Sequence, residues 1–332
     1  MLKYPEFWNN FSILSILLYP LSLIFKLGTA TRKAFSVMTK LEAPIICIGN
    51  ISVGGSGKTP LIKEVAKFFL KKSLKVVIVS KGYPLNITTP ILVSSKCDPA
   101  SVGDEPLELY NALSDYDNFD LLASSNFINT IDIIKRIRPA LVLVDDFFQN
   151  TTFYKDVKIL TVDGERGFGN EFIIPAGPLR QTIHSGIEEA DIVVSINPNA
   201  KIDAKLSGSV KYIKITATLD LNVHSDDKLF AFCAIGNPSK LLSELKKKHN
   251  LVGNMIFQDH HHYTTKDIQA IILAAKKTGA TTLVTTEKDA QKIDINLMNF
   301  PVKICRLEFN QKDILNLIDN ILKKLPSTII RS

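Results

Sequence analysis

A repeated alternation of short apolar runs with helical stretches constrains the fold of this chain more than any other feature. Helical patterns such as 61–72 and 129–138 separate several of the runs. Nearly continuous apolar strands separated by helices indicate a parallel sheet that is covered on both faces. The sequence therefore predicts an α/β fold. In the first two thirds of the 332 residues, the runs occupy 43–49, 75–80, 120–124, 140–145, 157–163 and 191–196.

A glycine-rich segment follows the first of these runs and precedes a helical stretch. Residues 50–60 read NISVGGSGKTP. Glycines let backbone N–H groups wrap an anion, the helix N-terminus points at it, a lysine reaches the phosphates and a hydroxyl meets Mg²⁺. Ser52 stands where the strict Walker pattern has glycine. We expect a P-loop-like site that binds ATP through Ser52, Val53, Gly54, Gly55, Ser56, Gly57, Lys58 and Thr59.

A second series of apolar runs begins near residue 228 and indicates a second α/β unit. Its runs are each followed by a helical stretch and occupy 229–236, 251–257, 281–286 and 302–307. We place the boundary near residue 220, beside a polar linker with strand-like runs. The predicted parts are an apolar and basic N-terminal helix (1–40), a nucleotide-binding domain with a parallel sheet (41–220) and a smaller α/β domain (221–332).

The N-terminal segment has no charged residue from Phe7 to Phe25. As one helix it would be roughly 28 Å long, slightly short of the hydrocarbon thickness of a bilayer. Pro20 is expected to kink it. Basic residues follow directly: Lys26, Arg32, Lys33 and Lys40.

Four interpretations of this segment compete. A secretory signal would explain the small residues 28–30, but the basic residues follow the apolar run instead of preceding it. A spanning helix is borderline in length, and a buried core helix gives the same apolar pattern. We favour a monotopic anchor whose basic end lies on anionic headgroups, with cytoplasmic orientation.

Two consecutive acids lie at the end of the run 140–145: Asp145 is its last residue and Asp146 follows it. Asp145 and Asp146 occupy the position of a Walker B strand end, where one acid holds Mg²⁺ and the other orders its surroundings. A guanine-specific loop is not expected, because Lys288 in the sequence Thr286–Asp289 is one position away from the pattern that such a loop needs.

Composition limits the remaining function classes. Four scattered cysteines without a CxxC pair exclude a disulfide scaffold and a zinc ribbon, and suit a reducing compartment. The formal net charge of +7 indicates an anionic partner. Nucleic-acid binding is not expected, because the lysines are dispersed and no aromatic–basic platform occurs. The sequence indicates no obligate protein partner.

Several motifs in order along the chain together resemble one family. The matching segments are 46–60 (ICIGNISVGGSGKTP), 102–106 (VGDEP), 162–170 (VDGERGFGN), 175–180 (PAGPLR), 234–238 (AIGNP), 257–261 (FQDHH) and 285–290 (TTEKDA). They closely resemble the tetraacyldisaccharide 4'-kinases of lipid A biosynthesis, from the N-terminal helix to about residue 290. The resemblance implies phosphorylation of the 4'-hydroxyl of a tetraacylated disaccharide 1-phosphate lipid by ATP and Mg²⁺, giving lipid IVA. It also implies a place at the cytoplasmic face of a Gram-negative inner membrane.

The resemblance also suggests roles for individual residues. Asp104 is the first candidate for the catalytic base, although an Asp before Glu-Pro also caps a helix well. A histidine of the 259–262 segment should assist it. We favour His260, with His261 as the alternative, and catalysis would then require the two domains to close. Consecutive histidines in one loop rarely chelate one ion, which argues against a zinc site.

The remaining candidates are assigned by type. The catalytic set is Asp104, His260, His261 and Asp146; the metal set is Thr59, Asp145, Asp146 and Glu165; the substrate set is Arg166, Arg180 and Gln149. For the two arginines, a loop-anchoring ion pair is an equal alternative.

One segment departs from the family pattern. Residues 147–150 read FFQN where the family usually has GLQH, so Asn150 replaces a histidine and removes any proton role there. A competing function is a membrane-associated P-loop ATPase that acts as an assembly or partition switch. Such an ATPase would share the phosphate loop and the anchor, but it would need neither Asp104 nor the histidine loop.

Overall fold

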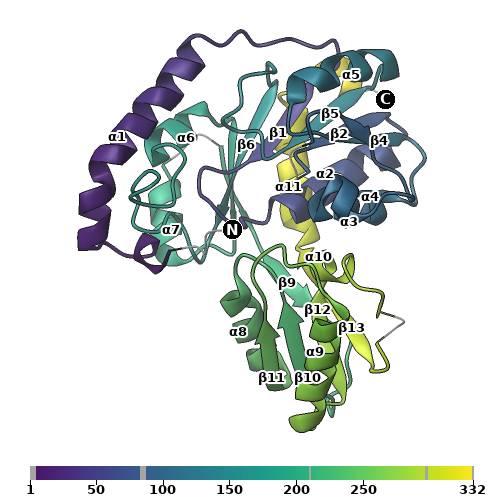
Figure 1. Cartoon of the computed structure of the whole chain (residues 1–332). Coiled ribbons are helices and arrows are strands. Elements are labelled where there is room, and N and C mark those ends of the chain that lie inside the picture. The colour runs from purple at the N-terminus through teal and green to yellow at the C-terminus, as the bar shows by residue number, and fades with distance from the viewer. Residues whose placement is uncertain (1–4, 83–86, 209–210, 296–297, 331–332) are drawn as a thin grey trace.

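The computed structural model describes residues 5–82, 87–208, 211–295 and 298–330. Two sheets, each flanked by helices, lie one above the other in Figure 1, and the long helix α1 forms an arm beside the larger one. The predicted α/β fold with an N-terminal apolar helix is confirmed.

The larger sheet has eight strands and is parallel except at one edge, where β3 runs antiparallel to β4. The predicted runs of the first series all form strands of this sheet. In spatial order the strands are β3 (Ile91–Leu92), β4 (Phe119–Ala123), β2 (Val76–Ser80), β5 (Leu141–Asp145), β1 (Ile45–Gly49), β6 (Val157–Asp163), β7 (Ile192–Ile196) and β8 (Lys211–Ile215).

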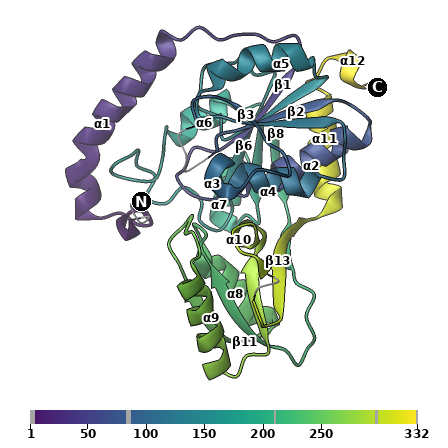
Figure 2. The ribbon, with the colours of Figure 1, turned by 45° about the vertical axis from the view of Figure 1, so that its right-hand side comes forward.

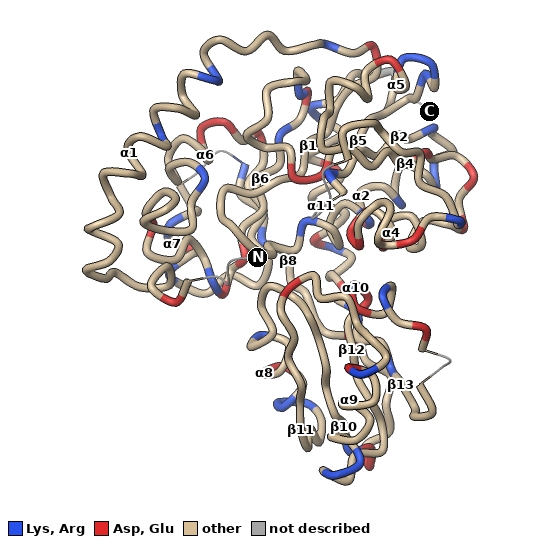
Figure 3. The backbone as a smooth tube through the Cα atoms, in the orientation of Figure 1, with Lys and Arg blue, Asp and Glu red and all other residues tan. Residues whose placement is uncertain are grey.

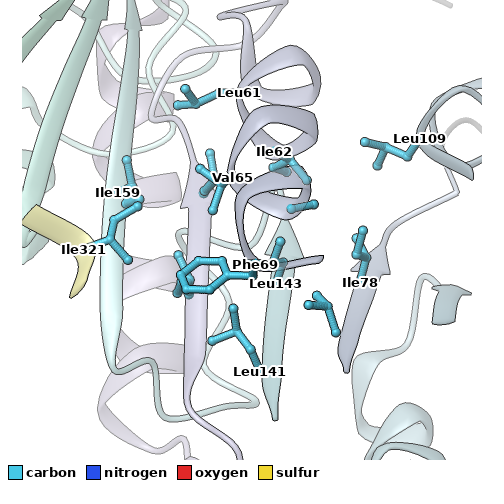
Figure 4. Close-up of a cluster of buried hydrophobic side chains, with 14 of the residues drawn as sticks. Leu61, Ile62, Val65, Phe69, Ile78, Leu109, Leu141, Leu143, Ile159 and Ile321 are labelled. Atoms are coloured by element: carbon cyan, nitrogen blue, oxygen red, sulfur yellow. The ribbon is translucent and has the colours of Figure 1, made fainter. Parts of the chain in front are cut away.

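Helices cover both faces of the larger sheet. One face packs against α2, α4 and α11, and Figure 4 shows Leu61, Val65 and Phe69 of α2 lying over the strands. The other face packs against η2, α5, α6 and α7. The helices of this unit, apart from α1 and α11, are η1 (Glu6–Trp8), α2 (Lys58–Lys71), α3 (Pro99–Val102), α4 (Asp104–Leu113), η2 (Phe127–Thr130), α5 (Ile131–Ile137), α6 (Ile183–Glu189) and α7 (Ala200–Leu206).

The smaller sheet has five strands, and only its edge strand β9 is antiparallel to its neighbour. It is flanked by α8 (Pro238–Lys248) and α9 (Thr265–Lys277), while the short α10 (Glu287–Ala290) follows β12. In spatial order the strands are β11 (Asn250–Ile256), β10 (Lys228–Cys233), β12 (Thr282–Thr286), β13 (Val302–Phe309) and β9 (Ala217–Asp220).

The chain crosses between the two units twice, at Thr216, close to residue 220, and again after β13. Strand β9 already belongs to the smaller sheet. After β13, α11 (Gln311–Leu322) and α12 (Ser327–Ile330) return to the larger unit, as Figure 2 shows. Leu317 and Ile321 of α11 join the core of that unit. The division into domains stays a prediction, but the packing departs from the expected 221–332 segment because the apolar face of α11 is buried against the first sheet.

Helix α1 (Ile13–Ala34) has the opposite polarity to a soluble surface helix. Its buried residues are Ser15 and Ser22, whereas apolar side chains such as Leu17 and Ile24 are 69% and 68% exposed. Ser22 donates to the carbonyl oxygen of Ile173 at 2.7 Å. Figure 3 shows the first turns without charge and basic residues only toward the C-terminal end. This exposure rules out the buried core helix among the four interpretations.

Candidate active site

The phosphate loop lies at the carboxyl end of β1, in the middle of the larger sheet, where α/β proteins commonly bind ligands. Gly57 precedes α2 with φ +75°, and Gly54 has φ +106°. Both angles are left-handed and favour glycine. The loop therefore turns directly into α2, whose first N–H groups lack partners within the helix. Lys58 and Thr59 form the first turn.

Side chains from neighbouring segments hold the start of the loop. Gln149 donates through Nε2 to the carbonyl oxygen of Asn50 at 2.8 Å, and Asn50 donates to the carbonyl oxygen of Gly54 at 3.3 Å. A Cβ on Gly54 would lie 2.6 Å from a guanidinium nitrogen of Arg166. Gln149 and Arg166, both predicted to meet the substrate, therefore contact the phosphate loop in this structure.

The rest of the loop is fixed by the segment 173–180 and by β6. Ser52 forms a β-bridge with Leu179, and Val53 donates its N–H to Pro178 at 2.8 Å. The hydroxyl of Ser56 is buried and lies 2.9 Å from that of Thr161. The side chain of Ser56 is thus used within the fold, which leaves its backbone for a ligand.

Asp146, directly after β5, joins two basic residues of the site. Its carboxylate lies 3.4 Å from Nζ of Lys58 and accepts from Arg180 at 3.0 and 3.1 Å. Burial alone would raise the pKa of Asp146, but the charges of Lys58 and Arg180 outweigh it and lower the pKa to about 2. The predicted ion pair of Arg180 is therefore present, and it is made with a residue of the site.

Asp145, the last residue of β5, is in a different state from its neighbour. Ser80 donates to its Oδ2 at 3.4 Å, while Oδ1 is buried without a hydrogen-bond partner among the described residues. Burial raises the pKa of Asp145 to about 8; the charge of Glu105 adds to this effect and that of Lys58 opposes it. Two adjacent acids thus have opposite protonation tendencies.

Asp104 begins α4 and is 3% exposed. Gly103 takes the N-cap position, and the Asp104 carboxylate instead meets His260, whose Nδ1 lies 2.9 Å from Oδ1, and Lys292, whose Nζ lies 3.1 Å from Oδ2. Burial alone would raise the pKa of Asp104. The hydrogen bond from His260 and the charges of Lys288 and Lys292 outweigh burial and hold the pKa far below its usual value.

His260 and His261 have different surroundings. His261 lies 3.0 Å from Asp267 at the start of α9 and stacks on Phe257, with ring centroids 4.8 Å apart. His260 has φ +61°, which turns its ring back toward Asp104. The structure therefore brings together Asp104 and His260, and it places His261 in the packing of α9.

Glu165 does not join the other candidate metal ligands. Its side chain is 55% exposed and lies 3.5 Å from Nζ of Lys240, which also meets Asp163 at 3.4 Å. This places Glu165 in a contact with the smaller unit.

The phosphate loop and the histidine loop are neighbours across the two units. A Cβ on Gly236 would lie 3.3 Å from Oδ2 of Asp259 and 3.7 Å from the backbone nitrogen of Gly55. Gly236 thus lies within contact distance of both loops. Asp104, His260 and the phosphate loop consequently lie around one junction.

Two lysines of the site and one at its edge were not among the predicted site residues. Lys288 and Lys292 surround Asp104, and their spacing of four residues, just after an apolar strand, was the available signal. Lys63, buried in α2, pairs with Glu108 at 2.6 Å and with Glu287 of the smaller unit at 3.0 Å. Its sequence context is that of an ordinary helical lysine, so sequence gave no signal for it.

Comparisons with known proteins agree with this geometry. A family model described as tetraacyldisaccharide-1-P 4'-kinase matches residues 14–323. The chain is 36% identical over 326 residues to the tetraacyldisaccharide 4'-kinase of Rickettsia akari (strain Hartford), which covers 97% of this chain and 98% of the relative. It is also 36% identical over 329 residues to the enzyme of the same name from Rickettsia canadensis (strain McKiel), with 97% and 98% covered.

A solved structure shares the fold over nearly the whole chain. It is LpxK from Aquifex aeolicus, described as an "apo" form in complex with ATP, with a TM-score of 0.73 and 22% identity. The match covers 95% of this chain and 100% of that one. The full-length relatives and the family model lead to one conclusion: the chain belongs to the tetraacyldisaccharide-1-P 4'-kinase family of lipid A biosynthesis.

Proposed function

We propose that the kinase reaction takes place at the junction of the two units, with Asp104 accepting the proton of the 4'-hydroxyl as the oxygen attacks the γ-phosphate of ATP. The observation that carries this proposal is the 2.9 Å contact between Asp104 and His260 beside the phosphate loop. His260 orients the carboxylate. Because phosphoryl transfer depends mostly on positioning and charge neutralisation, a strongly ionised Asp104 suits the role.

ATP would be held by the loop 52–59. Backbone N–H groups at the start of α2 and the ammonium group of Lys58 face the same end of the sheet as Asp146. The complex of the Aquifex aeolicus protein with ATP supports the same nucleotide here. Arg180, now paired with Asp146, is placed to meet a phosphate when the nucleotide displaces part of that contact.

The acids at the end of β5 fit Mg²⁺. The buried Oδ1 of Asp145 has no hydrogen-bond partner among the described residues, which suits a ligand of a cation. In those residues no group of three or more His, Cys, Asp or Glu side chains could hold a metal. This agrees with Mg²⁺, which proteins bind through one or two carboxylates and substrate phosphates. Thr59, Asp145 and Asp146 would hold it, and it would neutralise charge on the phosphates.

The exposed apolar side chains of α1 support attachment to the inner membrane at its cytoplasmic face. The helix has 22 residues and is long and apolar enough to cross a membrane by length and composition. Because its serines face the protein and its apolar residues face outward, we infer a monotopic anchor held at the acyl boundary. Lys26, Arg32 and Lys33 lie toward its C-terminal end, where they would meet anionic headgroups.

The decisive test is transfer of labelled γ-phosphate from ATP to tetraacyldisaccharide 1-phosphate in detergent micelles. Lys58→Ala and Asp104→Ala should each lower the rate by roughly 10²-fold or more. The matched controls are Lys71→Ala and Asp117→Ala, which change exposed residues of the same unit and should keep the native rate. ATP hydrolysis without lipid labelling, unaffected by Asp104→Ala, would overturn the proposal in favour of an ATPase switch.

A further inference from the structure

Lys288 lies at the centre of the charged groups around the histidine loop. Its Nζ is 3.2 Å from Oδ1 of Asp259 and 3.2 Å from Nε2 of His260. It is also 3.8 Å from Asp104 and 3.9 Å from Glu105. Its side chain is largely buried, so protein groups and not water surround its ammonium group.

The donors and acceptors at this position determine where the protons are. Burial alone would lower the pKa of Lys288, but the carboxylates of Glu105, Asp259 and Asp104 outweigh it and raise the pKa, so the amine is an ammonium. An ammonium only donates, so Nε2 of His260 must accept. An ionised carboxylate only accepts, so Nδ1 of His260 must donate to Asp104.

We propose that Lys288 is a positioning residue for phosphoryl transfer: by donating to Nε2 of His260, it places the single ring proton on Nδ1, facing Asp104. His260 is then neutral and orients Asp104 without forming a full ion pair with it. This inference rests on the proposed roles of Asp104 and His260 and adds the group that sets the state of the histidine.

The surroundings of the ring indicate what happens without Lys288. Oδ1 of Asp259 lies 3.8 Å from Nε2, and Lys288 currently lies within hydrogen-bond distance of both. With methionine at 288, Nε2 would keep the Asp259 carboxylate nearby and lose the Lys288 ammonium group. The contact that keeps Nε2 unprotonated would then be gone, and the ring proton would no longer be held on Nδ1 facing Asp104.

Lys292 provides an internal contrast. It contacts the same carboxylate as His260, at 3.1 Å from Oδ2 of Asp104, and it lies 3.4 Å from Asp289. Its contacts are thus with the acids, while Lys288 contacts the ring nitrogen itself. Loss of Lys292 should change the charge near Asp104 and leave the proton of His260 on Nδ1.

The test is the ¹⁵N NMR spectrum of the full chain in detergent micelles, labelled at histidine, with the His260 signals assigned by their loss in His260→Gln. The native protein should show a neutral ring with the proton on Nδ1. Lys288→Met should lose this pattern and show protonation at Nε2, whereas Lys292→Met and the exposed-site control Lys277→Met should show the native pattern. Unchanged signals of the other histidines would establish that each variant is folded.

Kinetics supply the second readout. Lys288→Met should lower kcat by about tenfold or more, less than the roughly 10²–10⁴-fold of a complete proton-transfer group. The KM for ATP should change by less than about twofold, because among the described residues the polar contacts of Lys288 are with Asp104, Glu105, Asp259 and His260 and not with the phosphate loop. A native ring with its proton on Nε2, or a native-like ring and rate in Lys288→Met, would overturn the inference.

Failure of the proposed function would look different. If Asp104→Ala and His260→Gln retained lipid phosphorylation, the assigned roles would be wrong whatever the NMR spectra showed. If those two variants were inactive and Lys288→Met kept the native ring and rate, only the role of Lys288 would be wrong.

Discussion

Asp104 and His260 lie 156 positions apart in the chain, yet their side chains share one hydrogen bond. Sequence motifs predicted that these two residues act together, because each belongs to a short segment typical of the family. The lysines around them were not assigned to the site from the sequence, although Lys288 lies in the family segment 285–290. A lysine is normally exposed, and the burial of Lys292 depends on how the segment after β12 packs beside α4.

The two neighbouring histidines should respond differently to the same substitution. His260→Gln removes the partner of Asp104, and we expect kcat to fall by roughly 10²-fold. His261→Gln removes a contact with Asp267 and a ring stacked on Phe257, so we expect a lower Tm and a nearly native kcat. Lipid phosphorylation and thermal unfolding of both variants would measure this, and the reverse ranking of the two kcat values would contradict it.

Asp145 should make the stability of the metal-free protein depend on pH. Its pKa is raised to about 8, whereas an aspartate in an unfolded chain has a pKa of about 3.9. Between these values the folded state binds a proton that the unfolded state does not, so the free energy of unfolding falls as pH rises.

Asp145→Asn should abolish this fall. With a chelator present, we expect its free energy of unfolding, measured by urea unfolding, to exceed the native value by a margin that grows from about pH 5 to about pH 8, on the order of a few kcal/mol at the upper end. Asp117→Asn, at an exposed position, is the control. A margin that stays constant across this range would show that burial of Asp145 has no such effect.

At the scale of whole elements, the strands were predicted well because a buried parallel strand appears in the sequence as a continuous apolar run. The run around 210–219 was harder. The described part of it forms β8 and β9, one strand in each sheet, with Thr216 between them. A sequence pattern shows which residues are apolar, but it does not show which of the two sheets a strand joins. The packing of α11 against the first unit was not predicted for the same reason. The sequence of an amphipathic helix shows its apolar face but not which surface that face covers.

The polarity of α1 leads to a prediction about membranes. Leu17→Asp combined with Ile24→Asp places two charges on the outward face, and we expect binding to vesicles containing anionic lipid to fall by roughly 10²-fold or more. Leu273→Asp combined with Leu315→Asp changes two leucines on α9 and α11 that are each 55% exposed, and it should leave vesicle binding unchanged. Co-sedimentation measures both. Equal loss in the two double variants would argue against a specific role for α1.

At the scale of the molecule, Lys63 connects three segments. It belongs to the helix that follows the phosphate loop, and it pairs with Glu108 of α4 and with Glu287 of the smaller unit. Since α4 begins at Asp104 and Glu287 precedes Lys288, this buried cation connects the helices that carry the proposed chemistry.

Removal of Lys63 should separate stability from activity. Lys63→Met leaves Glu108 buried and unpaired, at a cost of about 3–5 kcal/mol in the free energy of unfolding. Lys63→Met with Glu108→Leu removes both charges and should recover most of that loss. In the double variant Glu287 keeps its ion pair with Arg306 at 3.2 Å but loses its contact with α2, so we expect kcat to stay below native. Urea unfolding and lipid phosphorylation would measure this; full recovery of both quantities would show that Lys63 acts on stability alone.

The burial of Asp104 also bears on how much ATP the protein hydrolyses when no acceptor lipid is bound. A water molecule that reached the γ-phosphate would find the only proposed base 3% exposed and already engaged by His260 and Lys292. The acceptor lipid can use part of its own binding free energy to bring its 4'-hydroxyl against this buried carboxylate, whereas a water molecule has almost no such binding free energy. We therefore expect a cell that holds ATP in large excess over this lipid to lose little ATP to hydrolysis by the protein while no lipid is bound.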